Sequence, residues 1–344
     1  MEFTTGGRLE VRINAADVGK RVSVRSLNDR RGSPERFTDT VGVLTSWSGG
    51  VLCVTRRDGE TVEIAEAALV AGKVVPPTPP RRRGPAASVP ELLRVATRGW
   101  PPVETGRLGE WILRAAGGFT ARANSVLPLG DCGLPLPAAV DRVTEWYAER
   151  GLPPRFQVGT GDPAFDRALD QELAGRGWRA ERHALLRTAA LAPIADAEPE
   201  GGERPVELSR EPDAAWLAAY GRGAAGDAAR AVLTGGPSVW FATVPGDQGP
   251  AAIARCVTDG RWAGFAALHV AGDARRQGLG TLVMARLARQ ALQEGASAAY
   301  LQVETGNDGA AALYDRLGFR TLSAYHYRTP ETTGTDGGDD GQRG

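Results

Sequence analysis

A basic, glycine-rich turn lies between an apolar run and a helical pattern near the end of the chain. The turn, RRQGLG at residues 275–280, follows the strand-length run 261–273 and precedes apolar residues at helical spacing over 282–292. The first N–H groups of a helix have no intrahelical partner, and the helix dipole makes them a site for anions. Because Gly278 and Gly280 carry no side chain, a phosphate can approach this backbone closely. The pattern predicts a phosphate site, with a simple turn into a helix as the alternative.

The residues around the glycines favour a phosphate, and their spacing excludes two common phosphate motifs. Arg275 and Arg276 add positive charge, and the hydroxyl of Thr281 adds a hydrogen-bond donor. A dinucleotide fingerprint would need a third glycine and an acidic residue about 20 positions further on, and a nucleotide triphosphatase loop would need Gly-Lys-Ser/Thr. The chain has none of these features at this turn. We therefore expect a phosphate-bearing ligand of another kind.

A second motif follows in AAYLQVETGNDGAAALYDRLGFRTLSAYHYR, residues 298–328, which predicts a strand, a polar turn, a short helix and a final strand. Together the two motifs resemble the GNAT N-acetyltransferases, which carry Arg/Gln-x-x-Gly-x-Gly/Ala and then Asn-x-x-Ala-x-x-Leu-Tyr-x-x-x-Gly-Phe. The matching residues are Arg275, Gly278, Gly280, Asn307, Ala310, Leu313, Tyr314, Gly318 and Phe319. The resemblance covers residues 205–329. It implies an α+β fold, a mixed central sheet flanked by helices, and acetyl-CoA as co-substrate.

The resemblance also implies which residues hold acetyl-CoA. Backbone amides from Gln277 to Thr281 would bind the pyrophosphate, and the strand Ala267–Val270 would hydrogen-bond the pantetheine arm. Asn307 would position the cofactor or the end of the preceding strand. The implied cofactor-binding residues are Leu268, His269, Val270, Arg275, Arg276, Gln277, Gly278, Leu279, Gly280, Thr281 and Asn307. No metal is expected.

The same family performs direct acetyl transfer to a primary amine in a ternary complex, which needs a proton acceptor and a proton donor. By resemblance, Tyr314 is the general acid, and an aromatic that only closes the core is the alternative. Glu304 resembles the base of the Val-Glu-x-x-Asn segment in mycothiol synthase, whereas Gln302 occupies the place of the acid in other members and cannot serve. His269 is the second candidate base, and catalysis without either residue stays open. The acceptor, a small molecule or a peptide or protein amine, stays open too.

The middle of the chain contains a degenerate copy of the C-terminal pattern. The paired segments are 177–188 with 318–329, 155–158 with 300–303, and 125–131 with 267–273. The copy lacks the Arg-x-x-Gly-x-Gly turn after Asp131 and has Leu173 in the place of Tyr314. We interpret it as a degenerate GNAT half that no longer binds CoA, in a tandem arrangement that resembles mycothiol synthase. Chance similarity between two αβ segments is the alternative.

A degenerate half that persists is expected to shape the acceptor site. The segment FTARANSVLP, residues 119–128, concentrates polar groups where the repeat predicts an apolar strand. We therefore take Arg122, Asn124 and Ser125 as candidate acceptor-site residues. Buried hydrogen bonds at the interface of the two halves are the alternative.

The N-terminal block carries short alternating runs separated by turn signals, which predicts a small all-β barrel resembling SH3-like barrels. Through Arg83 it has 14 Lys and Arg against 10 Asp and Glu, an excess of four that would suit a weak nucleic-acid or protein contact. Ordinary solvated faces explain it as well. The expected units are a barrel at 1–75, a Pro/Arg-rich linker at 76–88, the degenerate half at 89–190, a linker at 191–204, the catalytic domain at 205–329 and a disordered acidic tail at 330–344.

Composition limits the remaining function classes. The 344 residues have net charge zero, three cysteines without metal-site spacing, no signal-peptide pattern and no membrane-length apolar stretch. These features predict a reduced, cytoplasmic protein with no membrane partner. A CoA-binding regulator with weak activity, and an adaptor that acts through the barrel, are the two alternatives to an acetyltransferase.

Overall fold

The structure is a computed structural model that describes residues 11–27, 37–56, 60–75, 85–197, 204–221 and 226–331. The chain divides into two compact units, residues 1–83 and residues 84–344. The expected acidic tail, except for Pro330 and Glu331, lies outside the described residues, as does the linker segment 76–84.

The first unit is a six-stranded sheet in the order β1-β6-β2-β3-β4-β5. Its elements are β1 (Val11–Arg12), η1 (Ala15–Asp17), β2 (Arg21–Leu27), β3 (Phe37–Ser48), β4 (Val51–Thr55), β5 (Thr61–Ala65), η2 (Glu66–Ala68) and β6 (Leu69–Val74). Burial alternates along β2, where Val22 and Val24 are fully buried, and this is the period of a strand with one face on a core. The all-β expectation for this block is confirmed.

The second unit is built on an eight-stranded sheet in the order β11-β12-β13-β14-β15-β10-β16-β9, with β7 and β8 as a separate pair. Its first elements are α1 (Val89–Gly99), β7 (Glu104–Leu108), β8 (Trp111–Ala115), α2 (Leu136–Ala148), β9 (Phe156–Val158), α3 (Pro163–Gly175), β10 (Trp178–Ala190) and α4 (Leu191–Ala195). The rest are β11 (Glu207–Ser209), α5 (Ala214–Tyr220), α6 (Asp227–Thr234), β12 (Ser238–Val244), β13 (Ala252–Asp259), β14 (Trp262–Val270), η3 (Gly272–Ala274), α7 (Leu279–Gln293), β15 (Ala298–Glu304), α8 (Asp308–Arg316) and β16 (Arg320–Pro330).

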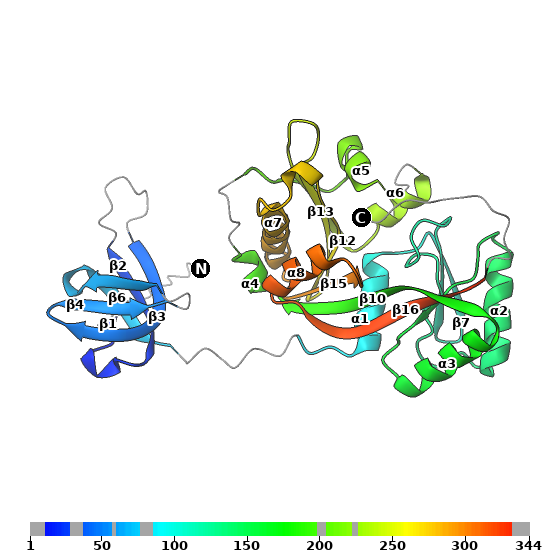
Figure 1. The fold of residues 1–344 in the computed structure, drawn as a ribbon, viewed down its shortest axis with the longest axis horizontal. Helices are drawn as coiled ribbons and strands as arrows, with labels where there is room; N and C mark the ends of the chain where they lie inside the picture. The colour runs from blue at the N-terminus through cyan, green and yellow to red at the C-terminus, as the bar shows by residue number, and fades with distance from the viewer. Residues whose placement is uncertain are drawn as a thin grey trace, which may run out of the picture. The chain divides into compact units, whose positions relative to one another are not determined.

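The last strand of each sequence repeat completes the sheet of the other repeat. Strand β10, which ends the middle segment, pairs with β15, and β16, which ends the C-terminal segment, pairs with β9. The two exchanged strands also pair with each other and run side by side across the unit (Figure 1). The two halves therefore share one sheet and cannot separate without breaking it.

The exchange follows the internal repeat residue by residue. Leu186 lies opposite Gln302 in one half, and Tyr327 lies opposite Gln157 in the other, at the positions that the sequence alignment makes equivalent. Side-chain contacts repeat too: Arg187 donates to the carbonyl oxygen of Phe319 and Arg328 donates to that of Trp178. Chance similarity would not produce matched registers and matched bonds, so the tandem interpretation is confirmed.

Three segments differ from the sequence expectation. Residues 119–128 form turns with isolated bridges at Val126 and Leu127 instead of a strand, because the side chain of Asn124 holds the backbone in a loop. The expected linker 191–204 begins with the helix α4, whose apolar side chains are buried in the core. The end of the expected linker 76–88 is also ordered, because Ala87 packs on the core and Ser88 caps α1.

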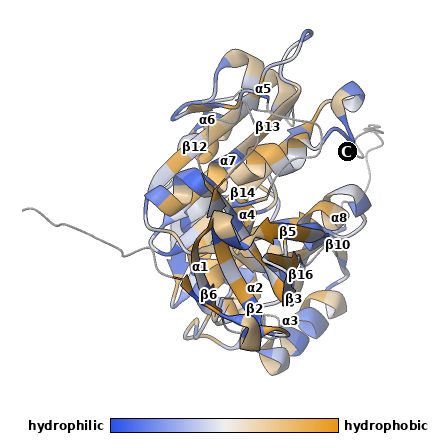
Figure 2. Cartoon of the chain, turned by 90° about the vertical axis from the view of Figure 1, so that its left-hand side faces the viewer, coloured by the Kyte–Doolittle hydropathy of each residue, from blue (hydrophilic) through white to orange (hydrophobic). Residues whose placement is uncertain are grey.

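Helix α7 packs on the C-terminal half of the sheet by one apolar face. Val283, Met284, Leu287 and Ala288 are fully buried, whereas Arg289 is exposed. Figure 2 shows this alternation of apolar and polar residues along the helix. The packing fixes the N-terminus of α7 beside the end of β14.

Candidate functional site

The N-terminus of α7 presents free backbone donors, as the glycine-rich turn predicts. Its N-cap is Gly278 in the left-handed conformation, at φ 76°, and no side chain caps the first turn. A side chain at this φ would be strained, so glycine is required by the backbone. At Gly280 the reason differs: a Cβ would lie 2.9 Å from Cδ2 of Leu313 on α8. The second glycine therefore lets the two motif helices pack closely.

Some polar side chains of the turn make hydrogen bonds within it or to a neighbouring segment. Arg275 donates to the carbonyl oxygen of Val270 at 3.4 Å, and Gln277 donates to that of Asp273 while accepting from Arg204 at 2.9 Å. Arg276 is exposed, at φ 62°, and no hydrogen bond ties its side chain to any other described residue. Leu279 is buried under the helix, and Thr281 is half-buried. Arg276 thus supplies the uncommitted positive charge at this end of α7.

Strands β14 and β15 separate beside this turn. Their parallel pairing ends at Phe265 and Leu301, and β14 then bulges at Ala267, whose φ is 55°. Beyond the bulge β14 stays paired with β13, but its other edge from Leu268 to Val270 pairs with no described strand. An edge that no described strand covers suits an extended amide-bearing chain such as pantetheine.

Tyr314 lies on α8 with its ring packed on Phe319, the ring centroids being 5.7 Å apart. Burial raises the pKa of its hydroxyl to about 12. The hydroxyl has no hydrogen-bond partner among the described residues, although the ring is part of the core. Tyr314 therefore both closes the core and presents a protonated hydroxyl without an internal role.

Glu304 is the last residue of β15, with 61% of its side chain exposed, and it pairs with Arg182 of β10 at 3.3 Å. Arg182 occupies a bulge of the exchanged strand at φ 49°, so the degenerate half places a charge beside the candidate base. His269 lies on β14 opposite Ile253 and is exposed. Asn307 accepts from the backbone N–H of Ala310 and caps α8.

A narrow cavity of about 10 Å³ lies where β14 and β15 separate. The described residues that line it include two arginines and no carboxylate: Ala96, Gly99, Trp100, Arg122, Arg255, Val257, Gly264, Phe265, Ala266, Tyr300 and Gln302. The ring of Tyr300 fills the space beside Gly264, where any Cβ would collide with its hydroxyl. Arg255 is fully buried and donates to the carbonyl oxygens of Leu233, Gly99 and Gly235, and burial lowers its pKa to about 10.

The three candidate acceptor residues have different roles in the structure. Asn124 is buried and makes four hydrogen bonds to backbone groups of its own loop. Ser125 is buried and accepts from Arg114 at 2.8 Å. Both side chains are thus used inside the protein, in hydrogen bonds within the degenerate half. Arg122 instead enters the cavity, over the ring of Trp100, and its Nε is buried without a partner.

Sequence reasoning missed most of the cavity. Trp100, Arg255 and Tyr300 lie on separate segments, and their local patterns are those of ordinary core residues. Two of its residues did give a signal: Arg122 lies in the polar run 119–128, and Gln302 is an amide at the position where the family resemblance implies an acid. Its Oε1 is buried and unpaired at the cavity.

The degenerate half lacks an equivalent of the α7 site. The corresponding helix α2 has Pro135 as its N-cap and Pro137 in its first turn. Proline has no N–H, so this terminus offers fewer backbone donors to a phosphate. Leu173, in the place of Tyr314, is fully buried in the core of that half.

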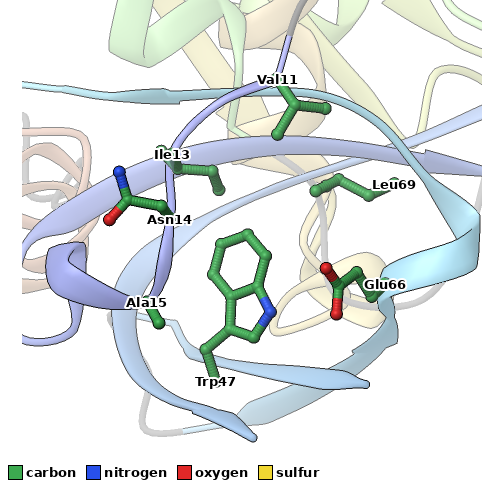
Figure 3. A pocket seen from close by; sticks show the side chains of 7 residues that line it. All are labelled: Val11, Ile13, Asn14, Ala15, Trp47, Glu66 and Leu69. Carbon is green, nitrogen blue, oxygen red and sulfur yellow. The ribbon is translucent and has the colours of Figure 1, made fainter.

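The barrel has a pocket of about 460 Å³ (Figure 3). It is lined by Val11, Ile13, Asn14, Ala15, Trp47, Glu66 and Leu69. Asn14 is occupied locally, because its side chain accepts from the N–H of Ala16 in a capping box. In the described part of the chain, no helix is long and apolar enough to cross a membrane, and no group of three or more His, Cys, Asp or Glu is placed to bind a metal.

Comparison with known proteins gives two family matches. Residues 86–328 match the family described as probable histone acetyltransferase Rv0428c C-terminal, and residues 16–73 match the Rv0428c N-terminal Sm-like domain. The second match makes the SH3-like description more specific: the barrel is Sm-like. A curated relative, the probable histone acetyltransferase Rv0428c of Mycobacterium tuberculosis, is 30% identical over 93% of this chain and 97% of its own length. The uncharacterized N-acetyltransferase YobR of Bacillus subtilis is 27% identical over 69% of this chain and 97% of its own.

Solved structures show the same fold. A GCN5-related N-acetyltransferase from Kribbella flavida has a TM-score of 0.53 at 18% identity and covers 72% of this chain and 96% of its own. A tandem GNAT protein from the clavulanic acid biosynthesis pathway has a TM-score of 0.50 at 19% identity and covers 74% and 91%. At these identities the likeness establishes the α+β tandem GNAT fold.

Proposed function

Since this chain belongs to the Rv0428c acetyltransferase family and is therefore an acyltransferase, we propose that it acetylates a primary amine, with one acetyl-CoA site, in its C-terminal half. Acetyl-CoA would supply the acetyl group as a thioester: the amide C–N bond forms as the C–S bond breaks, and a proton lost by the amine balances one gained by the thiol. The observation that carries this proposal is the uncapped N-terminus of α7 beside the open edge of β14.

The residues at this edge fit the three parts of the cofactor. The first-turn amides of α7, with Arg275 and Arg276, suit the pyrophosphate. The edge of β14 from Leu268 to Val270, which no described strand covers, suits the pantetheine amides. The degenerate half has prolines at the equivalent helix start, which supports a single site.

Two residues would handle protons. Tyr314 would donate to the departing sulfur, because its hydroxyl is protonated at neutral pH and unused within the described structure. Glu304 would accept the amine proton, because its carboxylate is exposed at the end of β15, beyond the point where β15 pairs with β14. His269, exposed on the neighbouring strand, is the alternative base.

Calorimetric titration with acetyl-CoA tests the proposal. We expect one site per chain, and Gly278→Val should abolish it by straining the N-cap and crowding the first-turn amides. Gly133→Val, at a left-handed glycine ahead of α2 with open space around it, is the matched control and should leave binding unchanged. Two equivalent sites, or undiminished binding by the Gly278 variant, would refute the proposed location.

A further inference from the structure

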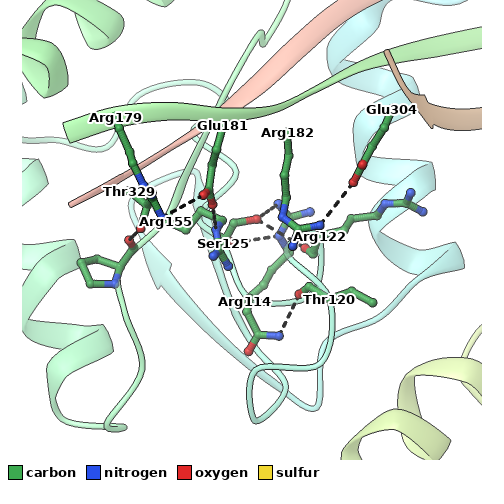
Figure 4. A network of polar contacts seen from close by, with 12 residues as sticks. Arg114, Thr120, Arg122, Ser125, Arg155, Arg179, Glu181, Arg182, Glu304 and Thr329 are labelled. Carbon is green, nitrogen blue, oxygen red and sulfur yellow. Dashed lines mark hydrogen bonds and ion pairs between the residues drawn. The ribbon is translucent and has the colours of Figure 1, made fainter. Parts of the chain in front are cut away.

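Strand β10 brings two arginines of the degenerate half to the candidate transfer residues. Arg182 extends from this strand to the carboxylate of Glu304, and both side chains of this pair are open to solvent (Figure 4). Exposed ion pairs contribute little, because water and salt screen them. Arg187 differs, because only 7% of its side chain is exposed. The charge of Arg187 is therefore the less screened of the two.

Arg187 is bonded to two residues that adjoin Tyr314. Its Nη2 donates to the carbonyl oxygen of Phe319 at 2.9 Å and pairs with Asp315, the residue after Tyr314 on α8. Phe319 contacts Tyr314 twice: its N–H donates to the carbonyl oxygen of Tyr314 at 2.9 Å, and the two ring centroids are 5.7 Å apart. The position of the Tyr314 ring therefore depends on the guanidinium of Arg187.

The guanidinium of Arg187 also acts on the Tyr314 hydroxyl through its charge. Burial raises the pKa of this hydroxyl to about 12, and the charge of Arg187 opposes the rise. The carboxylate of Asp315 balances that charge only in part, because 64% of its side chain is exposed to water whereas Arg187 is buried. A phenol that donates toward a departing sulfur gains negative charge on its oxygen, and a buried cation nearby stabilises this charge.

The equivalent arginine of the other half is paired more completely. Both arginines bond to a carbonyl oxygen, but the Nε and Nη2 of Arg328 also donate to the carboxylate of Asp170. The Nε of Arg187 is buried and has no hydrogen-bond partner among the described residues, which is unfavourable for a residue that only fastens a strand. The half that contains Tyr314 thus keeps the less fully paired guanidinium, whereas the other half has Leu173 in the place of the tyrosine.

We propose that Arg187 is a positioning residue for acetyl transfer: it orients Tyr314 and stabilises the negative charge that the hydroxyl oxygen gains as its proton moves toward the departing sulfur. Any proton that passes from the O–H group to the sulfur of CoA is replaced from water. This inference rests on the proposed function, in which Tyr314 is the acid. It makes the degenerate half part of the transfer chemistry through one buried side chain.

A double-mutant cycle tests whether Arg187 acts through the hydroxyl. The variants are Arg187→Gln, whose amide can donate to a carbonyl oxygen but carries no charge, Tyr314→Phe, and the two together. With Tyr314 present, Arg187→Gln should lower kcat by about 3- to 10-fold, the range for one hydrogen bond, and leave the KM for acetyl-CoA within about twofold. In the Tyr314→Phe background the same change should lower kcat by less than about twofold.

Two further variants separate the charge of Arg187 from its structural contacts. Arg187→Lys keeps the charge and should turn over faster than Arg187→Gln. Arg328→Gln is the matched control, because it removes the equivalent hydrogen bond in the other half, and it should leave kcat within about twofold of the wild type. A loss of kcat that is as large without the hydroxyl as with it, or as large in the control, would overturn the inference, as would Arg187→Lys being no faster than Arg187→Gln.

Titration of the hydroxyl separates this inference from the proposed function, because it needs neither turnover nor cofactor. Fluorotyrosine, whose hydroxyl is more acidic, replaces the six tyrosines, and the fluorine NMR signal missing from Tyr314→Phe belongs to Tyr314. Arg187→Gln should raise the pKa of this hydroxyl. Asp315→Asn, an exposed change that spares the core even if Arg187→Gln does not fold, should lower it.

The two proposals fail in different ways. If acetyl transfer occurs but neither variant shifts the pKa of the Tyr314 hydroxyl, or Asp315→Asn raises it, the inference fails while the proposed function stands. If both shifts appear and no amine is acetylated, the electrostatic coupling stands and the transfer proposal fails.

Discussion

Replacing Tyr314 by Phe isolates one hydroxyl from the rest of the candidate site. The ring contact with Phe319 and the burial in the core do not need the oxygen, and the hydroxyl has no partner among the described residues. The variant should therefore unfold within about 1 kcal/mol of the wild type, in line with substitutions that remove no contact. Affinity for acetyl-CoA should change little, because the proposed pyrophosphate and pantetheine contacts lie on α7 and β14.

The size of the kinetic effect follows from the pKa of the hydroxyl. Burial raises the pKa of Tyr314 to about 12, above the value of about 8.5 for an ordinary thiol, so complete proton transfer to a thiolate is uphill. Tyr314 then acts mainly through a hydrogen bond to developing negative charge, which is worth about 1.5–3 kcal/mol. At 1.36 kcal/mol per tenfold, kcat should fall by about 10- to 150-fold.

The assay measures kcat by release of free thiol at saturating substrates, together with acetyl-CoA affinity and thermal unfolding for both proteins. The reasoning predicts a loss in kcat alone. It is refuted if Tyr314→Phe turns over within about twofold of the wild type, and also if the loss appears mainly in cofactor affinity.

Three further predictions follow from other parts of the structure. If Glu304 is the base, Glu304→Gln should depress the rate most at low pH, where little of the amine is neutral, and recover partly as pH rises; a pH-independent loss would favour His269 or no base. Removal of residues 1–83 should leave acetyl-CoA affinity within about twofold by calorimetry, since the cut keeps Ala86, whose carbonyl oxygen accepts from Arg261; weaker binding would make the barrel part of the catalytic body. The hydrogen bond from Arg328 lowers the pKa of Asp170 in the folded protein. The ionised pair therefore stabilises the fold at pH values above the pKa of Asp170 in the unfolded chain, near 4, and this stabilisation is lost as pH falls through the lower pKa of the folded protein. Asp170→Asn should lower the Tm by about 2–4 °C at pH 7 and by less below pH 4, measured by calorimetry, and an equal loss at both pH values would contradict the assignment.

The reciprocal exchange of β10 and β16 explains why the degenerate half persists. Arg187 of one half and Arg328 of the other each bond to a carbonyl oxygen at the start of the opposite exchanged strand. The half without a glycine-rich helix start therefore still contributes a strand to the sheet of the other. The exchanged strand also places Arg182 beside Glu304.

The sequence by itself determined the features that depend on local backbone and periodicity. The turn into α7 was predictable because glycine readily adopts the left-handed conformation that Gly278 has. Since glycine has no side chain, a helix that begins at Gly278 also has no capping side chain at its N-cap. The position of Tyr314 was predictable because motif spacing places it on α8, two turns after Asn307 caps that helix. Alternation of apolar residues predicted the barrel strands, and the repeat predicted two halves.

Only the tertiary structure decided which residues from distant segments meet. Strands β10 and β16, which end the two repeats, have similar sequences and equivalent registers. The sequence pattern therefore does not indicate which half each strand completes, and this is decided by the long-range pairing of β10 with β15 and of β16 with β9. The polar residues around Asn124 are compatible with a ligand site and equally with a buried hydrogen-bond network. In the folded protein Asn124 belongs to a buried network, because its side chain bonds to backbone groups of the loop. Arg122 and Gln302 lie 180 positions apart, and the exchange and separation of strands bring both to one cavity, because burial and unpaired polar atoms arise only from packing.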